Sequence, residues 1–503
     1  MRYDFLVIGS GPAGRKGAIA AAKLGKRVAI IERARQTIGG VCLHSGTIPS
    51  KTMREAILHL SGYRQREVYG DVYRRKRAIT MDDLRRKLAQ VTQHEIDVIE
   101  DQLERNDIDV ISGNAQFVSA NEVQVQRPEG QESFEAEKVL IAVGTKPSRP
   151  AHIPFDEENI FDSDDILRLK KIPRSMIVVG GGVIGIEYAI MFATLGVQVT
   201  VVDGRERMLD FCDREIVDSL LHHARLQGMM FRLGEEVIGI DRLQQNMVGV
   251  QLESGKRLIA DTALFCAGRI GDTESLNLEA AGLAPDERGR LWCNRDTHQT
   301  WVDHIYGVGD VVGFPALASV SMQQGRRAAC HAFGQPFEQW EHMPYGLFTI
   351  PEISMVGKNE QQLTAEKVPY EVGMARYREI ARGHIAGDTN GMLKIMFHRQ
   401  TRQILGVHCI GEAATEIVHI GQAVMALGGT IDYFRDAVFN YPTMAECYKV
   451  AAFDGLNKLA FDRPLEVGAV DPLESVRDNR EAASSAIAGD AGNEFAESEI
   501  TAV

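Results

Sequence analysis

The pattern of residues 9–32 recurs at residues 180–203 of this 503-residue chain. Each copy follows an apolar strand and reads as a glycine turn, a helix, a second apolar strand and an acid. The matched positions are Gly9 and Gly180, Gly11 and Gly182, Gly14 and Gly185, Val28 and Val199, and Glu32 and Asp203. Each copy is therefore predicted to be a βαβ unit, whose continuously apolar strands suit a parallel sheet covered on both faces. The repeat predicts an α/β chain that contains one fold twice.

Both glycine turns have the spacing G-x-G-x-x-G. The first glycine permits a tight turn, the second lets a pyrophosphate approach the backbone, and the third lets the helix pack closely on the strand. The helix that follows presents free N–H groups and a partial positive charge to the phosphates. Glu32 and Asp203 each end the next strand, where an acid can bind a ribose 2′-hydroxyl. Two dinucleotide sites are therefore expected, a flavin in the first copy and a nicotinamide in the second.

The residues after Asp203 leave the choice of nicotinamide open. An acid at this position favours NAD, whose ribose carries no phosphate. Arg205 and Arg207 follow closely and could pair with the 2′-phosphate of NADP. They could equally be solvated arginines of a turn, so the sequence permits both nucleotides.

A weaker pair of matching segments follows the two units. Residues 140–145 end in Gly144-Thr145, and residues 264–269 end in Gly268-Arg269. Either segment alone could be any buried strand that ends in a glycine turn. Because they occupy matching places, we interpret them as the strands that return beside each cofactor, with Gly144 and Gly268 facing it.

Composition excludes several classes of protein. The hydrophobic share of 44% and the charged share of 25% are those of an ordinary globular protein, and the length predicts about three domains. A net charge of −13 without a basic run argues against nucleic acid as a partner. Seven dispersed cysteines without Cys-x-x-Cys spacing indicate reduced thiols and no metal site. No secretory leader and no apolar run of about 18 residues is recognisable, so a cytoplasmic protein without a membrane partner is expected.

The rest of the chain divides into predicted segments. Residues 83–106 read as one long amphipathic helix. From about residue 345, strand-like runs at 346–350, 392–397 and 404–409 and a helix at 413–427 predict a separate α+β domain. The predicted divisions are 1–150 and 273–344 for the first nucleotide fold, 151–272 for the second, 345–465 for the α+β domain, and 466–503 for an acidic, disordered tail.

Two short segments resemble the class I pyridine nucleotide–disulfide oxidoreductase family. Residues 42–51, Cys-Leu-His-Ser-Gly-Thr-Ile-Pro-Ser-Lys, resemble the redox segment of that family, but Thr47 stands where the family has its second cysteine. Residues 441–446 resemble its His-Pro-Thr-x-x-Glu segment, but Tyr441 replaces the histidine. A disulfide needs two sulfurs. The thiol machinery is thus absent while the cofactor motifs are intact, which implies that electrons leave as they arrive, through a nicotinamide.

The resemblance also implies roles for individual residues. Residues 305–310 resemble the second flavin-binding segment, in which Asp310 would hold the ribityl chain and the following helix would face the isoalloxazine ring. Lys51 and Glu187, which alone would read as surface residues, would form an ion pair beside the reactive nitrogen of the flavin. Further cofactor contacts are implied at Gly40, Val41, Cys42, Thr47, Gly309 and Ala318.

The activity that the resemblance implies is reversible hydride transfer between NADPH and NAD⁺ through FAD, of the Si-specific type and with ping-pong kinetics. The α+β domain would build a homodimer or a larger homo-oligomer. The runner-up is an NAD(P)H oxidase or peroxidase that cycles Cys42 through sulfenic acid. A structural Cys42 is preferred, because Tyr441 has replaced the histidine and only His44 lies near in sequence. A disulfide reductase is disfavoured, and a non-catalytic nicotinamide sensor stays open.

Overall fold

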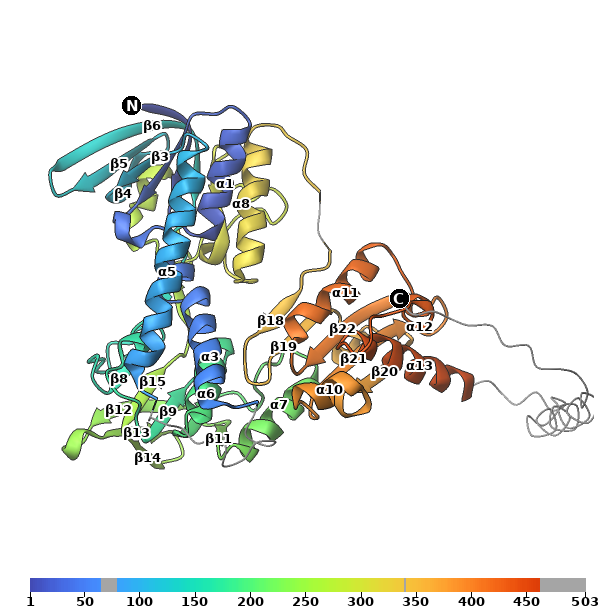
Figure 1. Cartoon of the computed structure of the whole chain (residues 1–503). Helices are drawn as coiled ribbons and strands as arrows, with labels where there is room; N and C mark the ends of the chain where they lie inside the picture. Colours follow the sequence, from blue (N-terminus) through green and yellow to red (C-terminus); the bar gives the residue numbers. More distant parts are fainter. Residues whose placement is uncertain (65–78, 339–340, 462–503) are drawn as a thin grey trace, which may run out of the picture. The chain divides into compact units, whose positions relative to one another are not determined.

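The computed structural model describes residues 1–64, 79–338 and 341–461 (Figure 1). One compact unit comprises Met1–Gly455, and a second comprises Leu456–Val503. Of the second unit, only the last residues of helix α13 (Glu446–Phe461) are described. The tail predicted at residues 466–503 lies outside the described residues, and the predicted domain boundaries stay a prediction.

The first sheet contains the N-terminal glycine turn. Its strand order is β3 (Asp109–Ser112), β2 (Val28–Glu32), β1 (Arg2–Ile8), β6 (Gly130–Ile141), β5 (Glu122–Arg127) and β4 (Asn114–Ser119), with β17 (Ile305–Gly307) also paired to β6. The pairs among β1, β2, β3, β6 and β17 are parallel, whereas β4, β5 and β6 form an antiparallel meander. Because β17 comes from residues 305–307, two distant parts of the chain complete this sheet. Helices α1 (Pro12–Lys23) and α8 (Ala318–Ala332) run side by side on one face (Figure 1).

The second sheet contains the second glycine turn. Its order is β11 (Met230–Leu233), β10 (Gln198–Asp203), β9 (Ser175–Val179), β15 (Thr262–Phe265) and β8 (Ile160–Asp162), all parallel. Helices α6 (Val183–Thr194) and α7 (Arg214–Leu226) connect its strands. An antiparallel meander, β12 (Val237–Arg242), β13 (Val248–Leu252) and β14 (Arg257–Ala260), shares a core with β9 and β15. The repeat seen in the sequence is thus confirmed as two copies of one parallel α/β fold.

Two short strands connect these folds. Strand β7 (Thr145–Pro147) pairs antiparallel with β16 (Arg269–Gly271), so that Gly271 faces Thr145 and Arg269 faces Pro147. The two segments that matched in the sequence therefore end in strands that pair with each other. Gly144 and Gly268, which come directly before them, lie where the chain crosses between the folds.

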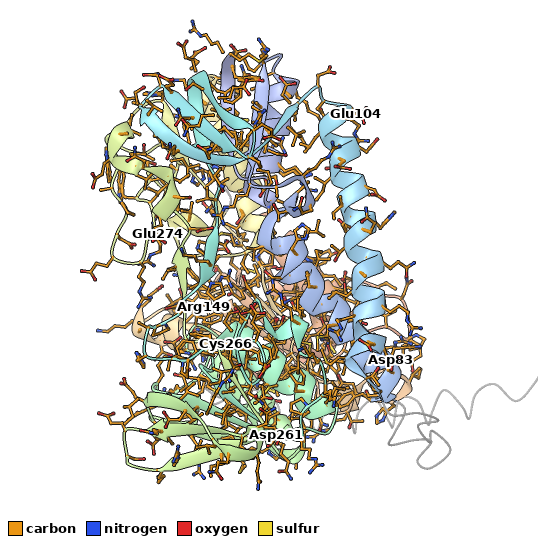
Figure 2. All side chains as sticks on the ribbon, turned by 90° about the vertical axis from the view of Figure 1, so that its left-hand side faces the viewer. Asp83, Glu104, Arg149, Asp261, Cys266 and Glu274 are labelled. Atoms are coloured by element: carbon orange, nitrogen blue, oxygen red, sulfur yellow. The ribbon has the colours of Figure 1, made fainter. Side chains whose placement is uncertain are left out.

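Helix α5 (Met81–Glu104) packs against the cores of both nucleotide folds. Its first turn contributes Met81 and Leu84 to the core that contains Val178 of the second sheet, and its last turns contribute Ile99 and Leu103 to the core beneath the first sheet (Figure 2). The helix begins two residues earlier than predicted, because the side chains of Thr80 and Asp83 cap its first turn reciprocally.

The last sheet is antiparallel and lies in the C-terminal part of the chain. Its order is β18 (Tyr345–Leu347), β19 (Ile353–Gly357), β22 (Ile404–Ile410), β21 (Met392–His398) and β20 (Tyr370–Arg376). Its helices are α9 (Glu360–Ala365), α10 (Ala381–Ala386), α11 (Ala414–Ala426), α12 (Ile431–Asp436) and α13. The α+β domain is confirmed.

The strand predicted at 346–350 is shorter than expected. It ends at Leu347, because the N–H of Phe348 and the carbonyl of Thr349 bind side chains of Glu187 and Arg54 in place of a strand partner. Within the described part of the chain, no helix has the length and apolar character needed to cross a membrane.

Candidate active site

A cleft of about 1460 Å³ is lined by both glycine turns, the segment 40–51, residues of η7 (Gly309–Val312) and the first residues of β18. Its volume exceeds the roughly 300–1,000 Å³ of a usual small-molecule pocket, as two extended dinucleotides require. The cleft contains every predicted site residue except Gly14 and Gly185. These two are the third glycines of their turns, whose predicted role is close packing.

The first glycine turn is shaped to admit a diphosphate. A Cβ atom at Gly14 would lie 1.9 Å from the carbonyl oxygen of Gly9, so only glycine lets α1 approach the strand here. A Cβ atom at Gly11 would meet nothing within 4 Å, which leaves open space beside the backbone. Helix α1 has no capping side chain, and its free N–H groups are available to an anion. The residues present therefore fit the diphosphate of FAD.

The second glycine turn repeats this geometry. A Cβ atom at Gly185 would lie 1.9 Å from the oxygen of Gly180, and one at Gly182 would meet nothing within 4 Å. Helix α6 likewise has no capping side chain. The two acids also bind alike, since Glu32 accepts the N–H of Ser10 at 3.0 Å and Asp203 accepts the N–H of Gly181 at 2.6 Å. The turns are thus equivalent in structure as well as in sequence.

Lys51 and Glu187 meet as the resemblance implied. Lys51 lies on α3 (Thr47–Ser61), and its Nζ is 2.6 Å from a carboxylate oxygen of Glu187 on α6. The other oxygen of Glu187 accepts the N–H of Phe348 at 2.8 Å, and the Phe348 ring lies 5.0 Å from the Lys51 Nζ. The Glu187 side chain is only 6% exposed. Such a buried carboxylate is tolerated as an ion when a cation and a hydrogen-bond donor both satisfy it.

Cys42 lies in the cleft as a thiol. It belongs to α2 (Gly40–His44), and each of the seven cysteines is free. Burial raises the pKa of the Cys42 thiol above its ordinary value, although the guanidinium of Arg15 and the hydroxyl of Thr47 oppose this rise. The ring of His44 is bound to the carbonyl of Ile38 at 2.8 Å. Near neutral pH this arrangement favours the unreactive thiol over the thiolate.

The segment around Asp310 closes another side of the cleft. Burial raises the pKa of Asp310, whereas the charge of Arg269 and a hydrogen bond with Ser321 oppose the rise. The N–H of Gly309 donates to Gln324 of α8 at 2.8 Å, which ties the turn to that helix. Helix α8 starts at Ala318 without a capping side chain, and its first turn lines the cleft. A polar ribityl chain and a ring edge that accepts hydrogen bonds would fit this corner.

Some cleft residues were missed from the sequence. Arg269 directly follows Gly268, and its guanidinium binds Asp164 at 2.9 Å and the Thr145 carbonyl at 2.8 Å. Its place beside a predicted cofactor glycine was the available signal. Phe348 was not predicted as a site residue, because its role depends on its contact with the distant Glu187. Tyr441 does not line the cleft and is 73% exposed in this chain.

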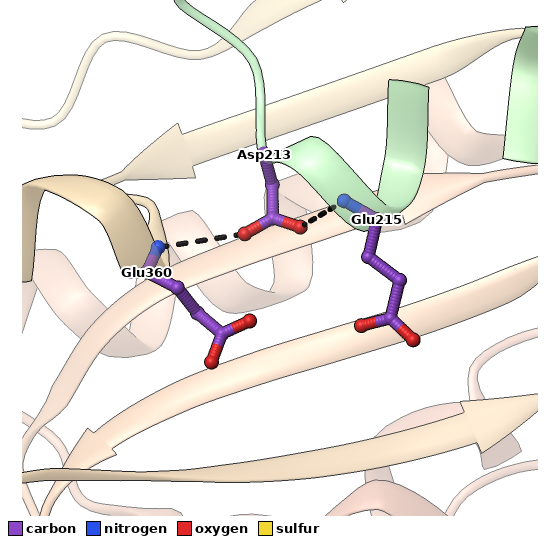
Figure 3. Close-up of side chains that lie close together, drawn as sticks. All are labelled: Asp213, Glu215 and Glu360. Atoms are coloured by element: carbon purple, nitrogen blue, oxygen red, sulfur yellow. Dashed lines mark hydrogen bonds between the residues drawn. The ribbon is translucent and has the colours of Figure 1, made fainter. Parts of the chain in front are cut away.

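A cluster of three carboxylates lies outside the cleft. Asp213, Glu215 and Glu360 approach one another closely enough to surround a cation (Figure 3). The ammonium of Lys394 already lies among them, 3.0 Å from Asp213 and 3.1 Å from Glu215 and also paired with Glu360. The cluster is therefore satisfied by a lysine of β21.

The fold and the cleft together define a flavoprotein with two dinucleotide-binding folds and a C-terminal α+β domain. The chain belongs to the pyridine nucleotide-disulphide oxidoreductase family. The sequence model of that family matches residues 3–325, and the model of its dimerisation domain matches residues 343–452. As a member of this family, the protein is a flavin-dependent pyridine nucleotide oxidoreductase that uses FAD with NAD or NADP.

The chain is similar to named relatives over most of its length. It is 53% identical over 460 residues to a soluble pyridine nucleotide transhydrogenase of Mycobacterium bovis strain BCG, covering 91% of this chain and 98% of that protein. A protein of the same name from a Marinomonas species is 45% identical over 462 residues, covering 91% and 99%.

Solved structures show the same architecture. The Cu(II) complex of the HOCl-induced flavoprotein disulfide reductase RclA from Escherichia coli has a TM-score of 0.81 at 29% identity, covering 90% of this chain and 99% of that one. LpdA from Mycobacterium tuberculosis has a TM-score of 0.83 at 25% identity, with coverage of 90% and 99%.

Proposed function

We propose that this protein transfers hydride reversibly between NADPH and NAD⁺ through bound FAD, without a redox disulfide. One observation carries the proposal. The ion pair of Lys51 and Glu187 lies in the cleft. The Cys42 thiol is hydrogen-bonded to the hydroxyl of Thr47 and not placed against a second cysteine. A disulfide needs a second sulfur at this place. The names of the relatives at 53% and 45% identity support the same activity.

The residues of this chain would bind the nucleotides and place charge in the cleft. The chemistry would be supplied by bound FAD, a group that can accept a hydride from one nicotinamide nucleotide and pass it to another. Lys51, paired with Glu187, places a positive charge in the cleft and would favour uptake of the negative charge that accompanies hydride. Gly182 and the N-terminus of α6 would hold the diphosphate of the nicotinamide nucleotide.

The second glycine turn is the single nicotinamide site of this proposal. NADPH and NAD⁺ would then occupy it in turn, which gives ping-pong kinetics. The enzyme would be an NAD(P)⁺ transhydrogenase of the Si-specific type. The C-terminal domain would join two copies into a homodimer or a larger homo-oligomer, and we retain the prediction of a cytoplasmic protein.

The test is anaerobic stopped-flow absorbance of the FAD-loaded protein. NADPH is mixed first, then thio-NAD⁺, and both the flavin band and thio-NADH are followed. We expect rapid loss and rapid recovery of the flavin band, with the same rates in the Cys42→Ser variant. Recovery only with oxygen or peroxide, and dependent on Cys42, would make the protein an oxidase or peroxidase. A flavin band that NADPH leaves unchanged would make it a sensor.

A further inference from the structure

Helix α3 carries a second cation one turn beyond Lys51. Arg54 follows Lys51 by three residues, so both side chains lie on one face of the helix. The Lys51 side chain is 24% exposed and lines the cleft, whereas the Arg54 side chain is only 6% exposed and does not. A buried guanidinium is costly unless its partners are well placed, so the groups that it binds are the first indication of its role.

The guanidinium of Arg54 binds the loop of residues 348–352, which connects β18 to β19. Its Nε donates to the carbonyl oxygen of Thr349 at 2.9 Å, and its Nη2 lies 4.0 Å from the carboxylate of Glu352. Its Nη1 pairs at 2.6 Å with Glu55, which is 52% exposed. The loop is therefore attached to α3 through a side chain that is shielded from water.

The same loop contacts the ion pair of Lys51 and Glu187. Phe348, which directly precedes Thr349, donates its N–H to Glu187 at 2.8 Å, and its ring lies 5.0 Å from the Lys51 ammonium. The contacts thus form a closed circuit that leaves α3 at Lys51, passes through Glu187 and the loop, and returns to α3 at Arg54. In such a circuit each contact restricts the positions that the others can take.

Glu352 attaches the other end of the loop to helix α11. Its carboxylate accepts the N–H of Ala413 at 3.1 Å and the hydroxyl of Thr415. Glu352 is 7% exposed, and Thr415 lines the cleft. The loop is therefore held at its two ends, by α6 at Phe348 and by α11 at Glu352, and Arg54 holds it between them.

We propose that Arg54 is a positioning residue for hydride uptake, which acts on the neighbouring ion pair through the loop 348–352. This inference rests on the proposed function, from which it takes the role of Lys51. Without Arg54, the loop would keep its attachment to α11 and lose the one to α3. The N–H and the ring of Phe348 would no longer be fixed against Glu187 and Lys51. The ammonium would then occupy several positions in the cleft, and a charge that is not preorganised stabilises a transition state less.

A double-mutant cycle on the reductive step tests the proposal. The FAD-loaded full chain is compared as wild type, Arg54→Met, Lys51→Met and the variant with both substitutions. Stopped-flow absorbance measures the rate of flavin reduction at saturating NADPH, and the flavin content of each protein shows that the cofactor is retained. In the wild-type background, Arg54→Met should slow reduction by about 10-fold, within the range of coupling between residues of one hydrogen-bond network. In the Lys51→Met background, where the charge is already absent, it should change the rate less than about 2-fold.

The midpoint potential of the bound flavin is the second readout. Because a fixed positive charge favours the reduced form, Arg54→Met should shift the potential to a more negative value, measured by equilibrium titration against a reference dye. Arg327→Met is the matched control. Arg327 is 8% exposed and also donates to a backbone carbonyl, that of Asp296 at 2.8 Å. Its replacement should lower the stability without changing the potential or the rate.

Equal slowing by Arg54→Met in both backgrounds would show that Arg54 only supports the fold, and the proposal would be wrong. An unchanged rate together with an unchanged potential would overturn it as well. If Arg54→Met does not fold, Arg54→Lys takes its place in the cycle, because an ammonium keeps the buried charge but lacks the fork that spans Thr349 and Glu352. It should slow reduction by about 3-fold, and only in the wild-type background.

These outcomes are separable from those of the proposed function. The cycle uses only reduction by NADPH, whereas the proposed function also requires reoxidation by thio-NAD⁺. Fast reduction without reoxidation would refute transhydrogenation and leave the test of Arg54 valid. Complete hydride relay with independent effects of Arg54→Met and Lys51→Met would refute this inference alone.

Discussion

The ammonium of Lys394 lies 3.0 Å from the carboxylate of Asp213, and both side chains are completely shielded from solvent. Asp213 also caps helix α7 of the second nucleotide fold, whereas Lys394 lies on β21 of the C-terminal sheet. The pair therefore connects two parts of the first compact unit through buried charge. Desolvation of such a pair is costly, so each partner depends on the other.

Replacing Lys394 by methionine should destabilise the protein by about 3–5 kcal/mol, because Asp213 would keep a buried charge without its cation. The measurement is chemical unfolding of the FAD-loaded protein, followed by intrinsic fluorescence. Lys358→Met removes an exposed partner of Glu366 and should cost less than about 1 kcal/mol. If both substitutions lowered the free energy of unfolding equally, burial of the Lys394–Asp213 pair would not be the cause of the larger loss expected for Lys394→Met.

Stability should fall as the pH drops from about 6.5 towards 4, in part through His408. Burial lowers the pKa of His408 to about 4. The unfolded chain therefore binds a proton in this window that the folded chain refuses, so the contribution of His408 is complete above about pH 6.5 and is lost towards pH 4. Thermal unfolding at a series of pH values tests this. The stability difference between wild type and His408→Gln should shrink on acidification, and a constant difference would refute the assignment.

Lys51→Met should slow the loss of flavin absorbance after mixing with NADPH by about 100-fold, as is usual when one preorganised electrostatic group is removed. The physical reason is that Lys51, 2.6 Å from Glu187, is a cation fixed within the cleft. Stopped-flow absorbance measures the rate at saturating NADPH, and the flavin content of the purified variant shows whether the cofactor is retained. Lys87→Met, on an exposed face of α5, is the control and should leave the rate unchanged. An unchanged rate in Lys51→Met would exclude this role.

Gly182→Ala should keep FAD and weaken NADP⁺ and NAD⁺ binding about 10-fold or more, because the new methyl group enters the space open to a diphosphate. The backbone of Gly182 is in an extended conformation that alanine also adopts, so folding should persist. Gly11→Ala is its counterpart in the first turn and should instead reduce the bound flavin. Flavin absorbance and calorimetry of both variants test this assignment of the two turns. Loss of FAD from the Gly182→Ala variant would instead indicate that FAD binds at the second glycine turn.

The sequence predicted those features whose requirements are local. Each glycine turn needs its glycines at set positions, so the spacing around Gly11 and Gly182 was sufficient to predict both dinucleotide folds. The reciprocal cap of α5 is equally local, since Thr80 and Asp83 have the spacing of a capping box, but it was not predicted, and the helix was expected to begin only at residue 83. The ion pair of Lys51 and Glu187 came from the resemblance to the family, and the structure brings the two residues together.

Other features exist only because distant segments meet. Strand β18 ends at Leu347, because the N–H of Phe348 donates a hydrogen bond to the side chain of Glu187 in place of a neighbouring strand. In the sequence, Lys394 is one polar residue within the strand predicted at 392–397. Its side chain is nevertheless buried beside Asp213, which is distant along the chain.

Arg205 illustrates the difference between what the sequence predicts and what only the structure shows. Its position two residues after Asp203 permitted either a solvated turn arginine or a phosphate ligand. The structure added its contact with both carboxylate oxygens of Asp203, whereas Arg33 of the first unit pairs with Asp272. Local sequence determined the turns, strands and helices, because backbone geometry and apolar periodicity act over a few residues. Which charges meet was decided by the tertiary structure, because Coulomb and desolvation energies depend on distance and burial in space and not on separation along the chain.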